Sequence, residues 1–314
     1  MDTIEWLLDA DPSIRWQVMR DVTDEPADAV ARERARVATE GWGARLLALQ
    51  APDGQWGGGT HSPVFVSTLF TLLTLRDLGL DPASEQARRA VALVHANSRW
   101  DYDPTMKFFE GEVEPCVNGK AVALGAYFGV DVRRIVDRLL TEQMADGGWN
   151  CEQENGSTVG SFNTTIDVLE GLLEYERATG DPRVSEPRRR GEEYLLARRL
   201  FRRLSTGEVV KPEFLEFSFP TRWFYDVLRG LEYFRSTGAR PNGRATEAIE
   251  LVERKRDGDG RWPLENTHPG KVYFEMEDGD GRPSRWNTLR AMRVLRWWDG
   301  RLPEPAVATA AGEV

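Results

Sequence analysis

One spacing pattern recurs along the chain and constrains its fold more than any other feature. An apolar residue is followed four positions later by Gln or Arg, then after four more by Gly, and after two more by Trp. Three copies keep this spacing: Leu46-x3-Gln50-x3-Gly54-x-Trp56, Leu139-x3-Gln143-x3-Gly147-x-Trp149 and Val252-x3-Arg256-x3-Gly260-x-Trp262. Residues four apart share a helix face and Gly favours a helix end, so each copy predicts a helix end over which the Trp folds back. With a weaker copy at Trp100, the period is roughly fifty residues, which is typical of repeat architectures.

A second repeated feature marks the starts of other helices. Pro, Ser and Thr are favoured at the first positions of a helix, and they recur in six segments. These segments are Pro12-Ser13-Ile14-Arg15-Trp16, Ser62-Pro63-Val64-Phe65, Pro115-Cys116-Val117-Asn118, Ser161-Phe162-Asn163-Thr164, Pro220-Thr221-Arg222-Trp223 and Pro283-Ser284-Arg285-Trp286. We therefore expect a helix to begin at each of them.

The helices that follow these starts are more apolar than the helices between them. Residues 69–73 and 121–126 consist of apolar and small side chains, whereas residues 83–97 and 188–203 are rich in charge. By amphipathicity the first kind is inner and the second outer, and about six inner and outer hairpins close a ring. The predicted fold is all-α, an α/α toroid formed by residues 1–300, with a flexible tail at 301–314. An open superhelix of the same hairpins is the alternative.

The Gln-x3-Gly-x-Trp turns resemble the QW repeats of squalene cyclases, and the chain up to about residue 300 resembles the α/α toroid of those enzymes and of protein prenyltransferase β subunits. This resemblance implies an enzyme acting on an apolar substrate, such as an isoprenoid, in the central cavity. It also implies that a second subunit can be needed, as in prenyltransferases. The Asp-x-Asp-Asp acid of squalene cyclases is absent, which disfavours squalene cyclisation.

Cysteine and histidine gather near the edge of the ring that carries the Trp turns. The long connections 101–114, 150–160 and 263–282 follow these turns, and long loops carry function. Thiolates and imidazoles together suit zinc, and a catalytic zinc site has three protein ligands with one position open. We predict Cys116, Cys151 and His268 as ligands, with His61 in reserve. Further carboxylates that could take part are Glu112, Glu114 and Glu152.

The ligand set can also be compared with known zinc sites on this fold. Prenyltransferase β subunits hold zinc with an Asp, a Cys at an inner-helix start and a distant His, and Cys116 and His268 are similar in kind. Lanthionine-forming cyclases use two Cys and one His, which implies zinc-dependent thiol chemistry as another activity. The alternative without metal is that both cysteines are small buried hydrophobic residues and the histidines are structural.

Aromatic and arginine side chains recur at the expected inner-helix starts. Phe65, Phe162, Trp223 and Trp286 could line a cavity for an isoprenoid or a carbocation, although core packing explains them equally well. Arg15, Arg222 and Arg285 each directly precede a Trp in three of the inner-helix starts, where they could bind a diphosphate or a carboxylate. Pairing with loop carboxylates is the alternative.

The segment from Glu265 to Asp280 is polar, contains Pro269-Gly270 and is long enough to fold over the mouth of the ring. We predict that it is a lid. An ordinary loop is the alternative.

Composition excludes several partners. The formal net charge of -10, with no basic stripe, disfavours nucleic acid. The longest apolar stretch, residues 64–75, is too short to span a membrane, and the first residues are acidic where a signal peptide is basic, so we expect a cytoplasmic location. The expected partner is an apolar small molecule or lipid. Besides an enzyme, a non-catalytic lipid- or peptide-binding toroid and a scaffold for another protein fit the same sequence.

Overall fold

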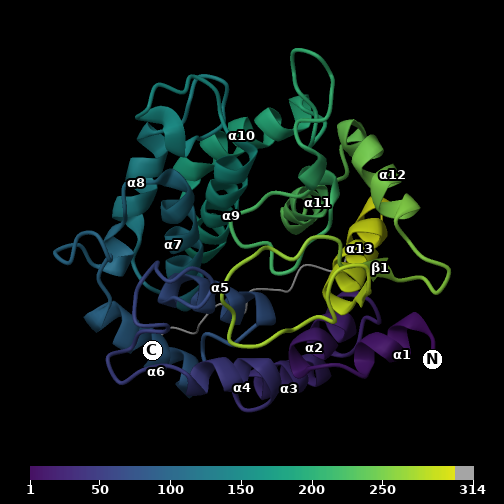
Figure 1. Cartoon of the computed structure of the whole chain (residues 1–314), viewed down its shortest axis with the longest axis horizontal. Coiled ribbons are helices and arrows are strands. Elements are labelled where there is room, and N and C mark those ends of the chain that lie inside the picture. The colour runs from purple at the N-terminus through teal and green to yellow at the C-terminus, as the bar shows by residue number, and fades with distance from the viewer. Residues whose placement is uncertain (301–314) are drawn as a thin grey trace.

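The computed structural model describes residues 1–300 and shows a ring of helices in two layers (Figure 1). In this part of the chain the inner layer comprises α2 (Pro12–Asp21), α5 (Thr68–Leu78), α7 (Pro115–Phe128), α9 (Phe162–Thr179), α11 (Val227–Ser236) and α13 (Arg285–Trp298). Around them lie α1 (Thr3–Leu8), α3 (Ala27–Ala35), α4 (Gly41–Ala48), α6 (Glu85–Asn97), α8 (Arg133–Thr141), α10 (Ser185–Ala197) and α12 (Thr246–Arg254). The expected tail at 301–314 lies outside the described residues.

Short elements occupy some of the connections. The 3-10 turns are η1 (Arg36–Ala38), η2 (Phe108–Glu110), η3 (Cys151–Gln153), η4 (Pro182–Val184), η5 (Pro212–Leu215) and η6 (Gly243–Ala245). The strands β1 (Trp262–Pro263) and β2 (Pro283–Ser284) pair antiparallel, with Trp262 opposite Ser284. This pairing joins the two ends of the connection between α12 and α13.

The ring closes through contacts between its first and last inner helices. From α5 to α13 each inner helix packs against the next, and α13 packs against α2. Between α2 and α5, the indole N–H of Trp16 donates to the carbonyl of Leu78 over 2.9 Å, and the amide of Gln17 donates to the carbonyl of Asp77 over 3.1 Å. The fold is therefore the predicted α/α toroid and not an open superhelix.

The Trp turns end the outer helices in the predicted way. The indole N–H of Trp149 donates to the carbonyl of Leu139 over 2.8 Å, and the side-chain amide of Gln143 donates to the carbonyl of Gly147 over 2.8 Å. Gly147 has a φ of +89°, which favours glycine. The indoles of Trp56 and Trp262 donate in the same way to Leu46 and Val252. Each Trp thus satisfies a carbonyl that its helix end leaves open.

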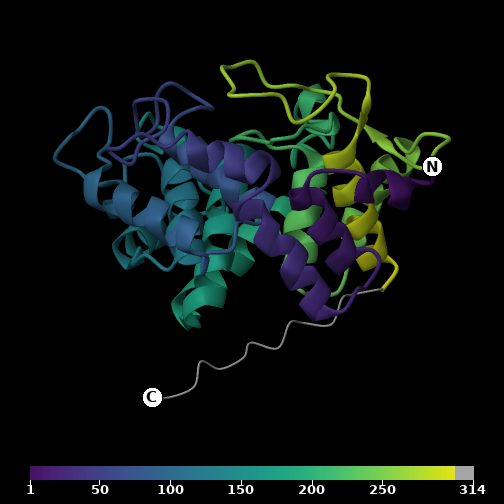
Figure 2. The same cartoon turned by 90° about the horizontal axis from the view of Figure 1, so that it is seen from below.

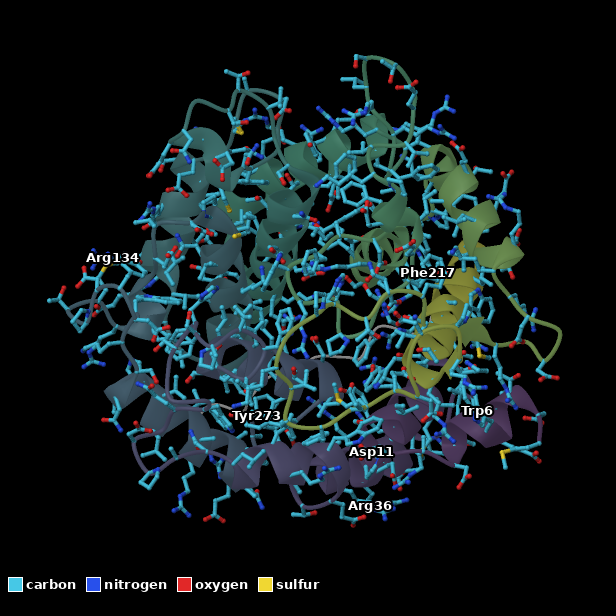
Figure 3. All side chains as sticks on the ribbon, viewed as in Figure 1. Trp6, Asp11, Arg36, Arg134, Phe217 and Tyr273 are labelled. Atoms are coloured by element: carbon cyan, nitrogen blue, oxygen red, sulfur yellow. The ribbon has the colours of Figure 1, made fainter. Side chains whose placement is uncertain are left out.

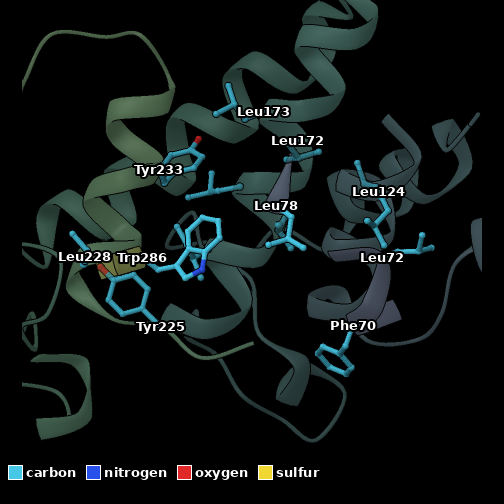
Figure 4. Packing of buried hydrophobic residues seen from close by; sticks show 14 of the residues in the cluster. Phe70, Leu72, Leu78, Leu124, Leu172, Leu173, Tyr225, Leu228, Tyr233 and Trp286 are labelled. Carbon is cyan, nitrogen blue, oxygen red and sulfur yellow. The ribbon is translucent and has the colours of Figure 1, made fainter. Parts of the chain in front are cut away.

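The closest packing in the ring joins α7 to α9. A Cβ on Gly171 would lie 2.3 Å from the carbonyl oxygen of Gly119, so neither helix tolerates a side chain there. The core between the layers is made of side chains such as Leu72, Leu124 and Leu172, which are fully buried (Figure 4). Close packing here places the side chains of α7 and α9 that face the centre of the ring within contact distance.

Two inner helices begin later than the sequence predicts. The first residue of α5 is Thr68 and that of α11 is Val227, so Phe65 and Arg222 lie in the preceding connections. Both have positive φ, +69° and +58°, which is incompatible with a right-handed helix. The other four expected starts hold to within two residues. Among the described helices, none is both long and apolar enough to cross a membrane.

Candidate functional site

The long connections lie along one edge of the ring. Figure 2 shows the ring from the side, with the yellow-green connection between α12 and α13 at the upper edge and the blue connections near it. We call this edge, which carries Trp56, Trp149 and Trp262, the Trp-turn rim. The segment 265–282 crosses the ring here in Figure 1, and the hydroxyl of Tyr273 (labelled in Figure 3) donates to the carbonyl of Val66 over 2.9 Å. The segment expected to be a lid therefore lies across the ring.

Three side chains of metal-binding type converge on the Trp-turn rim. A carboxylate oxygen of Glu114 and the sulfur atoms of Cys116 and Cys151 all lie within 4.8 Å of one another. Glu114 is the N-cap of α7 and Cys116 is in its first turn, whereas Cys151 begins η3, directly after the Trp149 turn. The glutamate is exposed and both cysteines are half-buried, so one side of the group faces solvent.

Hydrogen bonds to the two thiols shift their pKa values. The Sγ of Cys116 donates to Oε2 of Glu114 over 3.4 Å, and the Sγ of Cys151 lies 3.4 Å from Oγ1 of Thr164. Hydrogen bonding between the two cysteines lowers the pKa of Cys151, and the same interaction, with burial, raises the pKa of Cys116. The arrangement therefore favours a thiolate at Cys151 and a retained proton at Cys116.

Of the sequence-predicted zinc ligands, His268 lies apart from the two cysteines. Its Nε2 is 3.1 Å from Oγ of Ser218, and its ring stacks on Phe224 with centroids 3.9 Å apart. Burial lowers the pKa of His268 to about 4. The connection 263–282 packs against the residues before α11 and not against the start of α7, so the predicted triad of Cys116, Cys151 and His268 does not form.

The remaining candidate ligands have different surroundings. The ring of His61 lies 5.6 Å from that of Phe70, and burial lowers its pKa while the charge of Glu114 opposes the shift. Glu112 is buried, which raises its pKa, and its carboxylate accepts from the backbone N–H of Glu114. The carboxylate of Glu152 accepts from the side-chain amide of Asn155 over 2.8 Å. Glu114, one of the predicted alternatives, is the carboxylate placed beside the thiols.

A central cavity of about 460 Å³ runs through the inner layer. Its wall contains five acidic side chains, namely Asp77, Asp167, Glu170, Glu174 and Glu232. It contains ten basic side chains, namely Arg20, Arg34, Arg76, Lys120, Arg177, Arg222, Arg229, Arg235, Arg290 and Arg293. The resemblance implied an apolar cavity, and this charged wall departs from that expectation. Apolar surface is supplied chiefly by aromatic residues, including Phe70, Phe219 and Trp286.

Many of the cavity charges form a buried network. Lys120 of α7 and Arg229 of α11 both contact the carboxylate of Asp167 on α9, and Arg229 also donates to Glu170 over 2.7 Å. Burial raises the pKa of Asp167 despite these two cations. On the opposite side, Arg293 bridges Asp21 and Glu232. These ion pairs connect inner helices that are far apart in sequence.

The predicted substrate-binding residues fall into three groups. Arg222 and Trp286 line the cavity. Phe65 and Trp223 pack beside it, against each other and against Phe70.

The other two do not face the cavity. Phe162 is buried among Tyr194, Phe214 and Tyr225, between the two layers. Arg285 donates to the backbone carbonyl of Trp6 over 3.3 Å, on the side of α13 that faces α1. Each of these side chains points toward the outer layer, and neither lines the central cavity.

The sequence reasoning missed the buried charges of the cavity. Lys120 stands in the apolar run Val117 to Leu124, and Asp167 stands in the run Ile166 to Leu169. Lys120 is the one charged side chain of α7, and this isolated charge was the available signal, because such a charge is retained only with a partner. Asp167 gave no such signal, because α9 carries several other charges.

The chain matches no protein-family model and no curated protein. Among solved structures it is similar to a type II terpene cyclase from Scytonema in complex with geranylgeranyl dihydroxybenzoate, at 15% sequence identity and a TM-score of 0.43. The similarity covers 94% of this chain and 88% of that chain. At this identity and TM-score, the resemblance says nothing about the site.

Proposed function

We propose that this protein is a zinc-dependent enzyme whose metal centre is formed by Glu114, Cys116 and Cys151 on the Trp-turn rim. The observation that carries the proposal is the convergence of these three donor atoms within 4.8 Å, from the start of α7 and from the Trp149 turn.

The donor set suits zinc. Zinc–sulfur bonds are about 2.3 Å and zinc–oxygen bonds about 2.0–2.2 Å long, so donors around one ion lie within roughly 4 Å of each other. The observed spacing needs only small side-chain rotations to reach that value. Two sulfurs and one carboxylate leave a fourth position open, as catalytic zinc sites do.

Neighbouring residues prepare the thiols for this role. The lowered pKa of Cys151 makes it the first thiolate, and the hydroxyl of Thr164 holds its sulfur in place. Helix N-termini stabilise negative charge, so the first turn of α7 favours a second thiolate at Cys116 once a cation is present. A bound zinc ion would supply Lewis acidity, or activate a water or thiol at the open position.

The proposed substrate is an apolar molecule of isoprenoid type. Aromatic side chains occur at the end of the cavity beneath the Trp-turn rim, where the rings of Phe219 and Trp286 stack with centroids 4.3 Å apart. Phe70 lines the same cavity and contacts His61, which connects the cavity wall to the neighbourhood of Glu114. Aromatic faces suit isoprenoid chains and developing carbocations.

Metal analysis of the purified protein tests the zinc centre. We expect about one zinc ion per chain, and a Cys116→Ser/Cys151→Ser variant that binds zinc at least ~100-fold more weakly. His268→Ala is the matched control and should retain zinc, because its ring lies against Phe224 and Ser218. Zinc-free wild-type protein that takes up no zinc on titration would overturn the proposal. Thermal stabilisation by an isoprenoid alcohol in such a protein would instead identify a binding module.

A further inference from the structure

The charge of the cavity is opposite to the charge of the molecule. Ten basic side chains face five acidic ones in the cavity wall, whereas the whole chain has a formal net charge of -10. Behind the wall, Asp21 pairs with Arg20 and Arg293, and Asp226 lies 3.8 Å from Arg290. The basic excess that remains inside a ring of low dielectric constant creates a local positive potential. Such a cavity attracts anions, although the surface as a whole repels them.

One of these cations, Arg222, has no partner among the described residues. It makes neither a hydrogen bond nor an ion pair with residues 1–300, and its guanidinium stacks on the ring of Phe65 at 4.6 Å. Its backbone is held at a φ of +58°, a conformation that arginine rarely adopts. The guanidinium lines both the central cavity and the small pocket beneath the segment 265–282.

Two arginines in the corresponding positions of other repeats are satisfied by the protein. Arg15 forms an ion pair of 2.6 Å with Glu33, and Arg285 donates to the carbonyls of Trp6 and Asp9. The repeat itself therefore does not require an unpaired arginine. Arg222 differs in that it lines the central cavity and has no partner among residues 1–300.

Arg222 is half-buried, so its guanidinium loses part of its water without gaining an acceptor among residues 1–300. Desolvation lowers its pKa to about 10, and the charges of Asp77 and Glu275 oppose this only partly. An arginine presents five N–H donors in a fixed fork that matches carboxylate and phosphate oxygens. A bound anion would supply both the missing acceptors and the missing charge.

Further cations without a carboxylate partner line the opposite part of the cavity. Arg34 donates to the carbonyl of Gly79 and to the hydroxyl of Tyr127, both over 2.9 Å, and Arg177 donates to the carbonyl of Ser236. Gly79, Arg177 and Ser236 lie at the C-terminal ends of inner helices, where Arg177 is exposed. The cavity is thus reached from the edge opposite the Trp-turn rim.

We propose that the central cavity is a binding site for a small, multiply charged anion bearing carboxylate or phosphate groups, with Arg222 as the recognising guanidinium. The ligand enters at the C-terminal ends of the inner helices. A volume of about 460 Å³ is in the range of small-molecule sites, and an excess of basic over acidic wall residues favours more than one negative charge. The anion would occupy the same cavity as the aromatic side chains proposed above to contact an apolar substrate, so the two ligands compete for one space, whereas none of the three proposed zinc ligands lines it.

Calorimetric titration at constant ionic strength tests this site, with citrate and pyrophosphate as separate probes and chloride as the background ion. We expect saturable binding of one of the two per chain, and at least ~10-fold weaker binding to Arg222→Gln, because a charge-assisted hydrogen-bond pair is lost. Arg285→Gln is the matched control and should bind as wild type does. Tighter citrate assigns a polycarboxylate ligand, and tighter pyrophosphate assigns a phosphate ester.

Two further measurements separate loss of the anion site from loss of the fold and from loss of the zinc centre. Without anion, Arg222→Gln should melt close to wild type, since the replaced group has no hydrogen bond to lose and only its contact with the Phe65 ring is removed. The Cys116→Ser/Cys151→Ser variant should bind the anion unchanged, so loss of the zinc centre and loss of the anion site are separable. The proposal would be overturned if neither citrate nor pyrophosphate bound wild type saturably. It would also be overturned if Arg222→Gln and Arg285→Gln weakened anion binding equally.

Discussion

In each Trp turn the ring N–H and the backbone N–H of the tryptophan donate to different acceptors, and only the acceptor of the ring N–H could be predicted from the sequence. The ring N–H of Trp149 donates to the carbonyl of Leu139, in the helix that the Trp turn ends, as the ten-residue spacing predicts. Its backbone N–H donates to Oγ1 of Thr165 over 3.0 Å, one turn into the next inner helix. Thr68 and Thr288 accept from Trp56 and Trp262 in the same way. A single sequence shows these threonines only as helix residues, because their partner lies across a connection of variable length.

Replacing Thr165 by Val should destabilise the fold by about 1–3 kcal/mol, since the buried N–H of Trp149 loses its acceptor while the side-chain volume stays nearly constant. The free energy of unfolding in urea measures this loss. Thr74→Val is the control, because its hydroxyl donates to the carbonyl of Phe70 within the same helix and accepts from no backbone N–H. Equal effects of the two substitutions would contradict the role given to Thr165.

The metal-binding group was predicted in part from the residues. Cys116 and Cys151 follow two successive helix ends, so their meeting on the Trp-turn rim could be expected from the repeat. Glu114 was foreseen only as an alternative ligand. The position of His268 could not be derived, because it depends on the path of a twenty-residue connection whose polar sequence has no periodicity.

At the scale of elements, the outer helix ends were predictable and two inner helix starts were not. The segments that contain Pro63 and Pro220 have the residues typical of a helix start. The chain nevertheless continues along the rim for several residues before α5 and α11 begin. The positive φ values of Phe65 and Arg222 interrupt the helical path there. Such conformations follow from tertiary packing, since neither side chain favours them locally.

The contact between α7 and α9 depends on glycine at both surfaces. Gly171→Ala should lower the free energy of unfolding by about 1–3 kcal/mol, because the new methyl group would overlap the carbonyl of Gly119 and force the helices apart. Thermal melting and urea unfolding measure the change. Gly243→Ala is the control, since a Cβ there meets nothing within 4 Å. A fully stable Gly171→Ala variant would show that the two helices are farther apart than described.

For the whole molecule, the sequence predicted the ring but not the charge of its interior. Each inner helix contributes only a few ionisable residues to the cavity, and many of their partners come from other inner helices, as Asp167 pairs with Lys120 and Arg229. Composition averages over both layers, so an acidic chain gives no sign of a basic cavity. Lys120, Asp167 and Arg229 come into contact only when their helices pack side by side in the ring.

The buried carboxylate of Asp21, which pairs with Arg20 and Arg293, makes stability depend on pH. Burial of Asp21 opposes ionisation, but the hydrogen bond and charge of Arg20, with the charge of Arg293, prevail and lower its pKa from 3.8 to about 2. The folded chain therefore binds this proton less readily than the unfolded chain. The resulting stabilisation, about 2 kcal/mol, is present above about pH 4 and is lost as the pH falls toward 2.

The comparison of Asp21→Asn with wild type isolates this contribution. The difference in unfolding free energy between the two proteins should shrink by about 2 kcal/mol from pH 5 to pH 2. A pH-independent difference for Asp21→Asn would refute the proposed ionisation.

X-ray absorption spectroscopy at the zinc edge of the purified protein tests the proposed metal centre most directly. The predicted spectrum contains two sulfur neighbours at about 2.3 Å and oxygen at about 2.0–2.2 Å, and loses the sulfur contribution in the Cys116→Ser/Cys151→Ser variant. A zinc environment composed of nitrogen and oxygen alone, unchanged in that variant, would contradict a centre formed by Glu114, Cys116 and Cys151.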